Sequence, residues 1–568
     1  MFNRFKYIFF SKKYRDRTKE IDPDEVFIDS ENLPKFDVYQ FEGRIEKPIS
    51  HNTFVILTIF CFLLFGSFFF KAWLLQIKNG GENFDKSENN RLRHTLIFTK
   101  RGVISDRNGE NLAWNIYDEN NPEFSLRKYN STDGLSHIVG YLKYPSKDKY
   151  GFYYSEEFVG KDGVEKFYNE TLTGSNGLKI IEVDAHNKVQ SENMIRPAKD
   201  GADIKLSIDS KVQEKMYKEI SGLAERVGFT GGAGVMMDVN TGEILSLVSY
   251  PEYSSQIMTD GSNVSKINSY LKDKNTPLLN RAVDGLYTPG SIVKPFMAIS
   301  ALIEKIIDPY QNILSTGSIS IPNPYNPESP TVFKDWKAHG YVDMRKAIAV
   351  SSDVYFYAIG GGYQDQKGLG INLIDKYMSE FGFGKDLPKG FFSGTPGVIP
   401  TPEWKKENFN GEDWTVGNTY HTSIGQYGFQ VTPIQVVRSI AGIANGGKLL
   451  NPSILLGGNK DDFIQLPFFN DEYFRVAKEG MKMGVEEGVA TGLKTDYMTL
   501  GAKTGTAELG SKKQFVNSWI VGFFPYENPK YAFAVIMEKG PVTNTTGGVY
   551  VMRQVFDWMN IYAQKYLN

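Results

Sequence analysis

Three short motifs in the second half of the chain combine side chains that could carry out acyl transfer. They are Ser291-Ile-Val-Lys294, Ser351-Ser-Asp353 and Lys503-Thr-Gly505, in that order. A serine hydroxyl becomes a nucleophile when a neighbouring base takes its proton, and a neutral lysine can be that base. The second motif adds a hydroxyl and a carboxylate, and the third adds a cation and hydroxyls. Together they predict an enzyme that acylates itself on a peptide with a free carboxyl end.

The first motif is distinguished by its surroundings, because the Ser-x-x-Lys pattern also occurs elsewhere in the chain, as at Ser146 and Ser269. Tyr287-Thr-Pro-Gly290 is a turn signal, and residues 292–306 read as an apolar helix. The sequence therefore predicts Ser291 at a helix N-terminus, where free backbone N–H groups favour developing negative charge. Lys294 would share its helix face, and burial or a nearby cation would favour a neutral amine. An N-capping serine beside a solvated lysine is the alternative.

The other two motifs are equally weak alone and gain meaning from their settings. Ser351-Ser-Asp353 lies between apolar residues, where a hydroxyl and a carboxylate are costly unless they are hydrogen-bonded. A helix N-cap is the ordinary explanation for it, and a proton relay is the catalytic one. Lys503-Thr-Gly505 lies in a predicted strand. Thr504 and Thr506 could bind a carboxylate, and Gly505 would let a substrate backbone approach. A plain edge strand is the alternative.

The strands and helices that must position these motifs follow from the surrounding pattern. Two β-type runs flank a turn at Asn240-Thr-Gly242 and predict a hairpin. Three strand-like runs come far downstream, and helical periodicity dominates about 265–490. We expect an α+β domain in which early and late strands form one antiparallel sheet with helices on both faces. The runs are 233–239, 243–250, 498–507, 516–524 and 531–537, with a C-terminal helix at 549–566.

Composition limits the class of protein. The 568 residues are 41% hydrophobic and 23% charged, which is typical of a globular chain with two or three domains. A net charge of -2 gives no field that would attract nucleic acid. Cys61 is the only cysteine, so disulfides and thiol-ligated metal sites are excluded elsewhere. Six scattered histidines form no His-Glu-x-x-His pattern. No metal or other cofactor is predicted.

A membrane anchor is predicted near the N-terminus. Residues 53–70 are 18 uncharged residues and the apolar run extends to 75, about the length needed to cross a bilayer. The run begins too late for a cleaved signal peptide and lacks a small-residue cleavage site. Seven basic residues against one acid in the first 19 favour a cytoplasmic N-terminus. A buried core helix is the alternative. The predicted divisions are a cytoplasmic tail (1–52), a transmembrane helix (53–75), a strand-rich module (80–200) and a catalytic domain (203–566).

With these motifs the chain resembles the class B penicillin-binding proteins, from the anchor nearly to the C-terminus. Four further segments resemble the pedestal, or dimerisation-type, domain of that family: Asn90–Arg93, Arg101–Gly109, Gly160–Tyr168 and Leu172–Gly174. The resemblance implies a β-lactamase/transpeptidase-like catalytic fold. Motifs of a lipid-linked glycan polymerase are not apparent, so a monofunctional protein is implied.

Within the family the chain is most similar to the elongation subgroup, penicillin-binding protein 2. The Ser-x-Asp form of the second motif fits that subgroup, since the division enzyme usually has Ser-x-Asn. Two departures occur: Lys385–Gly390 replaces the usual segment, and Tyr427 interrupts the usual Gly-Gln-Gly. The segments that carry the similarity are Phe381–Gly384, Pro400–Lys405, Trp414–Gly417, Ser423–Gln426 and Val431–Gln435.

The resemblance also implies a mechanism. Ser291 would attack the D-Ala–D-Ala carbonyl of a peptidoglycan stem peptide, with Lys294 as base. Backbone N–H groups of Ser291 and Thr506 would hold the oxyanion. Ser351 and Lys503 would relay a proton to the leaving D-Ala, with Asp353 orienting them, and β-lactams would acylate Ser291 as covalent inhibitors. The implied catalytic residues are Ser291, Lys294, Ser351, Asp353 and Lys503, and the implied substrate-binding residues are Thr504, Gly505 and Thr506.

The family further implies a place and a partner. The protein would be a single-pass inner-membrane protein with a periplasmic catalytic domain, working with a SEDS-family glycosyltransferase during cell elongation. Three alternatives stay open. They are a division-specific septal transpeptidase, a D-Ala-D-Ala carboxypeptidase or β-lactamase, and a catalytically inactive sensor or scaffold.

Overall fold

The computed structural model describes residues 50–81, 92–120, 122–183, 189–323, 326, 328–388, 390–392, 394–458, 461–510 and 512–567. Most of the predicted cytoplasmic tail, with its basic residues, lies outside the described residues, as do Asn90 and Arg91 of one pedestal segment. The chain divides into two units, Met1–Leu92 and Arg93–Asn568.

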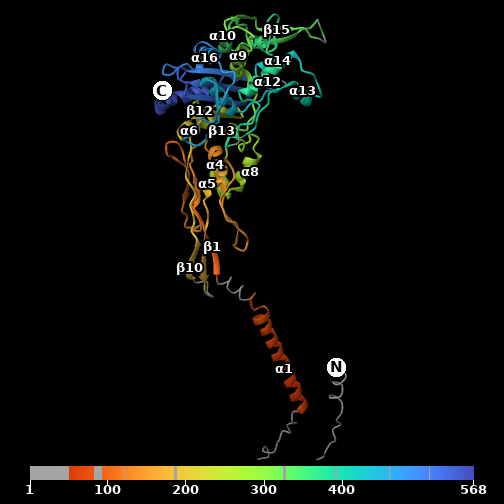
Figure 1. Ribbon diagram of the computed structural model, residues 1–568, viewed down its shortest axis with the longest axis vertical. Coiled ribbons are helices and arrows are strands. Elements are labelled where there is room, and N and C mark those ends of the chain that lie inside the picture. The colour runs from red at the N-terminus through yellow and green to blue at the C-terminus, as the bar shows by residue number, and fades with distance from the viewer. Residues whose placement is uncertain are drawn as a thin grey trace, which may run out of the picture. The chain divides into compact units, whose positions relative to one another are not determined.

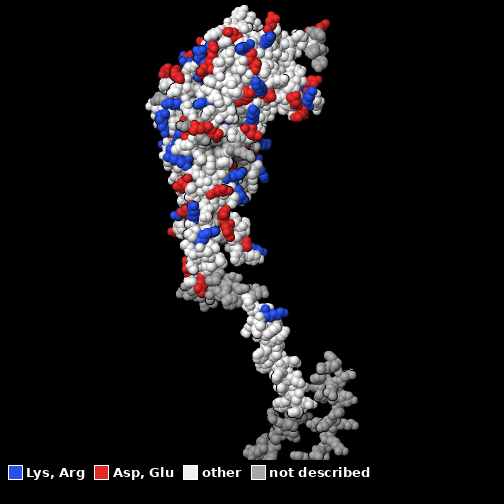
Figure 2. Space-filling view, in the orientation of Figure 1, with Lys and Arg blue, Asp and Glu red and all other residues white. Residues whose placement is uncertain are grey.

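The first unit contains the predicted anchor as a helix. α1 (His51–Trp73) starts at Ser50, whose hydroxyl accepts a hydrogen bond from the Thr53 N–H, and continues into a π-helical turn, η5 (Leu74–Lys78). None of the side chains of α1 is buried. Figure 2 shows this helix as an almost uncharged surface. Among the described residues it is the one helix long and apolar enough to cross a membrane.

The second unit is built around a five-stranded antiparallel sheet with the strand order β13-β12-β22-β21-β20. The early hairpin and the three late strands therefore form one sheet, as the sequence predicted. Val235 pairs with Ala534, and Lys503 pairs with Val521. The strands are β12 (Gly231–Asp238), β13 (Ile244–Tyr250), β20 (Gly501–Leu509), β21 (Phe515–Phe524) and β22 (Tyr531–Pro541).

Helices cover both faces of this sheet because its strands are apolar on both sides. Met236 packs in one hydrophobic cluster with residues of α6 (Ser210–Val227) and α17 (Gly548–Tyr562). Its neighbour Val235 packs in the other cluster, with residues of the central helices. The predicted α+β architecture is confirmed. The helices of the second cluster include α9 (Lys294–Ile303), α10 (Met344–Val350), α11 (Asp353–Gly361), α12 (Ile371–Glu380), α14 (Val416–Ser423), α15 (Pro433–Ala444) and α16 (Asp471–Glu486).

α9 is shorter than the sequence predicted. The expected helix reached Ile306, but α9 ends at Ile303 because Lys305 has a positive φ of 53° and leaves the helical path. The remaining short elements of the catalytic domain are α7 (Ser255–Asp260), α8 (Val264–Lys272), η6 (Gly290–Val293), β14 (Ile313–Ser315), β15 (Ser318–Ile321), β16 (Thr331–Lys334), β17 (Gly340–Val342), α13 (Pro402–Asn408), β18 (Lys448–Leu450), β19 (Phe463–Gln465), η7 (Thr491–Leu493) and η8 (Gln564–Tyr566).

The predicted pedestal is strand-rich. Figure 1 shows β1 (Leu92–Ile97) and β10 (Val189–Arg196) at its far end, away from the central sheet. These two strands flank β9 (Gly177–Val183). A second sheet has the order β11-β2-β3-β4. Its members and the remaining pedestal elements are β2 (Ile104–Ser105), β3 (Asn111–Ile116), β4 (Leu126–Tyr129), β11 (Ile204–Lys205), α3 (Ser136–Val139), β5 (Leu142–Lys143), β6 (Ser146–Lys147), β7 (Tyr153–Ser155), β8 (Val159–Gly160), α4 (Gly163–Phe167) and α5 (Asn169–Thr173).

A buried ion cluster explains two of the pedestal segments. The Arg101 guanidinium donates to Glu165 Oε2 at 2.5 Å, and Arg127 Nε donates to Glu165 Oε1 at 2.8 Å. All three side chains are at most 1% exposed. Arg101 also donates to the Thr173 hydroxyl at 2.5 Å. The segments Arg101–Gly109 and Gly160–Tyr168 thus meet through one carboxylate.

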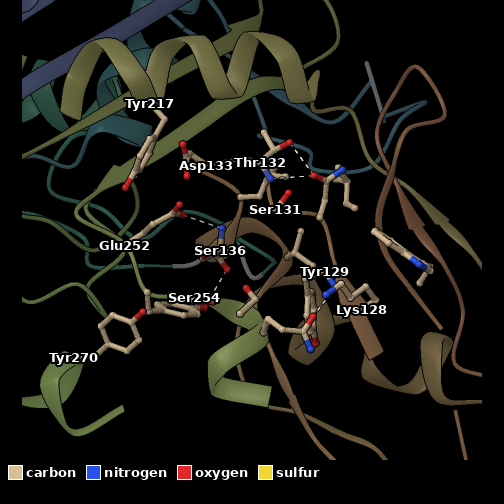
Figure 3. Close-up of a pocket in the computed structure, with 18 residues that line it drawn as sticks. Lys128, Tyr129, Ser131, Thr132, Asp133, Ser136, Tyr217, Glu252, Ser254 and Tyr270 are labelled. Carbon is tan, nitrogen blue, oxygen red and sulfur yellow. Dashed lines mark hydrogen bonds between the residues drawn. The ribbon is translucent and has the colours of Figure 1, made fainter. Parts of the chain in front are cut away.

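The pedestal and the catalytic domain are joined by polar contacts around a cavity of about 610 Å³. Glu252 follows β13 and accepts hydrogen bonds from the backbone N–H groups of Gly134 (2.6 Å) and Ser136 (3.0 Å), as Figure 3 shows for Ser136. Burial raises the pKa of Glu252 to about 7, although these two N–H groups oppose the shift. Tyr217 and Tyr270 line the same cavity.

Candidate active site

Ser291 lies in the first turn of a helix, as the turn signal before it predicted. It belongs to the 3₁₀ turn η6, which runs directly into α9 at Lys294. Gly290 has a positive φ of 58°, and its N–H donates to the carbonyl of Gly425 at 2.9 Å. A Cβ on Gly425 would lie 2.2 Å from the Gly290 oxygen, so only glycine fits there. The Ser423–Gln426 segment therefore packs closely against the turn that contains Ser291.

The third motif also packs against this turn. A Cβ on Gly505 would lie 2.8 Å from both the Pro289 oxygen and Cγ2 of Ile292. The sequence suggested that Gly505 leaves room for a substrate backbone, but the structure gives a different reason. The Pro289–Ile292 turn fills that space, because strand β20 packs directly against it.

Lys294 is completely buried and makes three hydrogen bonds. Its Nζ donates to Asp353 Oδ1 at 2.6 Å, to the Ser351 carbonyl at 2.9 Å and to Ser351 Oγ at 3.2 Å. Asp353 is the first residue of α11, where the helix N-terminus also favours a carboxylate. The buried ammonium therefore has a full set of acceptors, which a buried charge requires.

Lys503 approaches the same serine from the sheet. Its Nζ donates to Ser351 Oγ at 2.9 Å and to the Thr504 carbonyl at 2.8 Å. Burial lowers the pKa of Lys503 well below its ordinary value, the positive charge of Lys294 lowers it further, and Asp353 opposes the shift. The Ser351 hydroxyl thus bridges two lysine amines that share one carboxylate.

Ser351 holds this position through an unusual backbone conformation. It ends α10 with a φ of 60° and a ψ of 42°, the left-handed region that costs a non-glycine residue roughly 1–2 kcal/mol. Ser352 is the N-cap of α11, its hydroxyl accepting from the Tyr355 N–H. The N-cap explanation considered for this motif therefore applies to Ser352 and not to Ser351. Such strain is common at functional sites.

One cavity of about 1000 Å³ brings the predicted residues together. Ser291, Ser351 and Asp353 line it, as does the strand Thr504–Thr506. The amines of Lys294 and Lys503 lie behind this wall, where both residues are at most 1% exposed. All eight residues predicted from the three motifs therefore meet at one place.

The comparisons with known proteins agree with this geometry. The family profile of the penicillin binding protein transpeptidase domain matches residues 232–557, and that of the penicillin-binding protein dimerisation domain matches residues 122–206. The chain belongs to the penicillin-binding protein transpeptidases. The resemblance predicted from the three motifs and the pedestal segments is confirmed.

Named relatives place this transpeptidase within the family. It is 30% identical over 521 residues to the peptidoglycan D,D-transpeptidase MrdA of Haemophilus influenzae, which covers 84% of this chain and 76% of the relative. It is 31% identical over 472 residues to MrdA of Acinetobacter baumannii, covering 77% and 66%. These relatives, together with solved structures of PBP2, confirm the predicted similarity to penicillin-binding protein 2.

Solved structures give the same result. PBP2 of Pseudomonas aeruginosa in complex with WCK 5153 is 27% identical with a TM-score of 0.69, covering 84% of this chain and 98% of that one. The complex of PBP2 and MreC from Helicobacter pylori is 28% identical with a TM-score of 0.67, covering 83% and 99%.

The structure of this transpeptidase also reveals site residues that the motifs did not predict. Trp336, His421 and Tyr427 line the active-site cavity, and so does Asp335, although its side chain is fully buried. Asp335 follows β16 in a polar run, which from sequence alone reads as a turn. Tyr427, noted as a departure from the family pattern, takes a positive φ of 60°. Among the described residues no group of three or more His, Cys, Asp or Glu side chains could hold a metal ion.

Proposed function

We propose that this chain cross-links peptidoglycan as a membrane-anchored D,D-transpeptidase of the elongation type, with Ser291 as the nucleophile. One observation carries the assignment of roles. The Ser351 hydroxyl lies within hydrogen-bonding distance of both Lys294 and Lys503, in the wall of the cavity that Ser291 enters. A relay of this kind can take a proton from a nucleophile and return it to a leaving amine.

In the first step Ser291 Oγ attacks the carbonyl carbon between the two terminal D-Ala residues of a stem peptide. Its proton passes to the Lys294 amine. Burial and the charge of Lys294 favour a neutral Lys503, so the two amines together are short of one proton. Ser351 Oγ contacts both amines, so a proton can pass from Lys294 through this hydroxyl to Lys503. Lys294 then has a neutral amine that can accept the proton of Ser291.

The oxyanion that forms would be held by backbone N–H groups of Ser291 and Thr506. A Cβ on Gly290 would lie 3.2 Å from the Thr506 oxygen, so the two backbones run side by side at this point. Paired donors of this kind stabilise the tetrahedral intermediate more than the ground state. Thr504 and Thr506 are two positions apart in β20, so both side chains lie on the face that lines the cavity. They would bind the terminal carboxylate.

Collapse of the intermediate breaks the peptide C–N bond. The leaving D-Ala nitrogen takes up the proton through Ser351 and Lys503, and an ester remains on Ser291. An amine from a neighbouring stem peptide then attacks the ester, loses its proton to the same relay and restores the Ser291 hydroxyl. A β-lactam would acylate Ser291 in the same first step. The amine released by ring opening would stay covalently attached to the acyl group, so it would not leave the site as D-Ala does.

The setting of the enzyme belongs to the same proposal. We place residues 1–52 in the cytoplasm, the anchor at 53–75, the pedestal at 80–200 and the catalytic domain at 203–566 on the periplasmic side of the inner membrane. The uncharged surface of α1 and the two family matches support this division. Partners would be other cell-wall proteins, including a SEDS-family glycosyltransferase. The Helicobacter pylori relative was solved with MreC, which supports a partnership of this general kind.

Intact-mass analysis after incubation with benzylpenicillin tests the nucleophile. The wild-type chain in detergent should gain the mass of one penicillin, and Ser291→Ala should gain none. Ser269→Ala is the matched control, because Ser269 also heads a Ser-x-x-Lys pattern but lies exposed on α8. An adduct on Ser291→Ala, or no adduct on folded wild type, would refute the assignment. Rapid loss of the adduct would indicate a hydrolase instead.

A further inference from the structure

A buried carboxylate lies directly beneath the second motif. The Asp335 side chain is fully buried. Its Oδ2 accepts hydrogen bonds from Ser352 Oγ at 2.9 Å, from the Val354 N–H at 3.1 Å and from Ser315 Oγ at 3.3 Å. Its Oδ1 accepts one from the Trp336 N–H at 2.8 Å. Four donors from three segments thus converge on one side chain.

These contacts fix the first turn of α11. A helix leaves its first N–H groups without internal partners, and here Asp335 takes that of Val354 while Ser352 takes that of Tyr355. The Ser352 hydroxyl is in turn held by Asp335. Asp353, which pairs with Lys294, stands between the two residues that Asp335 contacts.

The same contacts constrain the strained junction before the helix. Ser351 connects α10 to α11 in the left-handed conformation, and its Oγ must reach both lysine amines. If the first turn of α11 were free to rotate, Asp353 and Ser351 would shift together. A misplacement of about 1 Å can cost roughly 100-fold in rate when reacting groups must be aligned.

We propose that Asp335 is a positioning residue of the acylation reaction. By holding the first turn of α11, it sets the places of Asp353 and the Ser351 hydroxyl relative to Lys294. It touches neither the substrate nor the nucleophile in this role. The proposal rests on the proposed function, since it assigns Asp335 to the acylation of Ser291.

A carboxylate suits this place better than a neutral group would. Asp335 only accepts hydrogen bonds, and every neighbour named above donates. Asparagine would keep one acceptor oxygen but would turn an NH₂ group toward donors. Alanine would leave the hydroxyls of Ser315 and Ser352 and the Val354 N–H without this acceptor, which costs more than losing the bonds themselves.

Asp343 provides a matched control in the adjacent helix. It is the N-cap of α10, and its Oδ1 accepts from the Lys346 N–H at 2.9 Å. Loss of a cap of this type lowers the stability of the helix. Asp343 lies at the far end of α10 from Ser351, so its loss weakens a helix without moving the second motif.

The test separates penicillin binding from the acylation step. Stopped-flow kinetics with a fluorescent penicillin give the dissociation constant Kd and the acylation rate constant k2 for wild type, Asp335→Ala, Asp335→Asn and Asp343→Ala. We expect k2 to fall about 100-fold in Asp335→Ala and about 10-fold in Asp335→Asn, with Kd changed less than about threefold. Asp343→Ala should lower Tm but keep k2 within about twofold of wild type.

Two results would overturn the proposal. One is a k2 within about threefold of wild type in folded Asp335→Ala, or in Asp335→Asn if the alanine variant does not fold. The other is an equal loss of k2 in Asp343→Ala at the same drop in Tm, because a general loss of stability would then explain both. Failure of the proposed function is distinguishable, since wild-type Ser291 itself would then not be acylated.

Discussion

Two buried clusters in this protein contain two cations and one carboxylate each, yet they suit different tasks. The pedestal places Glu165 between Arg101 and Arg127, and the active site places Asp353 near Lys294 and Lys503. The basic side chains are buried in both, but Glu165 is fully buried whereas Asp353 is 19% exposed to the active-site cavity. The difference is in the type of cation, and it decides whether the cluster can move a proton.

In the pedestal the charges are permanent. Burial lowers the pKa of Arg101, but Glu165 opposes the shift, and a guanidinium stays protonated in proteins. Each arginine directs its Nε to a separate oxygen of Glu165. Such a cluster fixes the geometry of two chain segments and nothing more.

In the active site one charge can be lost. A lysine amine gives up its proton when burial and a second cation disfavour the charged form, and both act on Lys503. Ser351 then provides a hydroxyl through which the remaining proton can move. The comparison indicates that excess buried positive charge stabilises a fixed joint when it is arginine and prepares a base when it is lysine.

The largest expected effect on acylation comes from replacing an active-site lysine with arginine, the cation that the pedestal cluster uses. Lys294→Arg keeps the charge beside Asp353 but cannot accept the Ser291 proton, so penicillin acylation should fall by about 10³-fold or more. Stopped-flow acylation measures this, and thermal unfolding reports whether the larger side chain is accommodated. Lys346→Arg on the exposed face of α10 is the control. Acylation within tenfold of wild type would break the comparison.

The next effect is on stability. Glu165→Gln leaves two buried guanidiniums without their carboxylate and should lower the free energy of unfolding by about 3–5 kcal/mol, as for other broken buried pairs. Chemical denaturation measures the loss. Glu192→Gln, which removes an exposed pair with Lys179, should cost less than about 1 kcal/mol. Folded Glu165→Gln should still acylate at the wild-type rate, and a large loss of rate would show that the pedestal cluster has a catalytic role.

The smallest effect concerns the joint between the domains. Because burial raises the pKa of Glu252 to about 7, above its usual 4.5, the folded state binds the proton more tightly than the unfolded state. This contribution to stability is present below about pH 4.5 and is lost as pH rises to about 7. Tm should therefore decline with pH over this range, against the background of Asp133 and Tyr217 nearby. Glu252→Gln should flatten that decline, and an unchanged slope would contradict the assignment.

Much of this could be predicted from the sequence because the deciding signals are local. The apolar runs at 233–239 and 516–524 predict strands of a sheet with helices on both faces, and the turn before Ser291 predicts the start of a helix. Spacing alone could not show that Gly505 is required by the Pro289–Ile292 turn, since that contact joins segments over 200 residues apart. The role of Asp335 could not be predicted from the sequence either, because its partners Ser315 and Ser352 come from other segments.

The central claim is that the amines of Lys294 and Lys503 together hold one proton fewer than two ammonium groups, and that protons pass between them through Ser351. The pH dependence of Ser291 acylation tests this claim most directly. The rate would be followed by intact mass in wild type and in Lys503→Met. We predict that the wild-type rate rises to a plateau well below the pH of about 10.4 at which a free lysine titrates. In Lys503→Met the rate should be lower and this rise should be lost, because the amine whose pKa burial and the charge of Lys294 lower is absent. The same midpoint in both proteins would contradict the account.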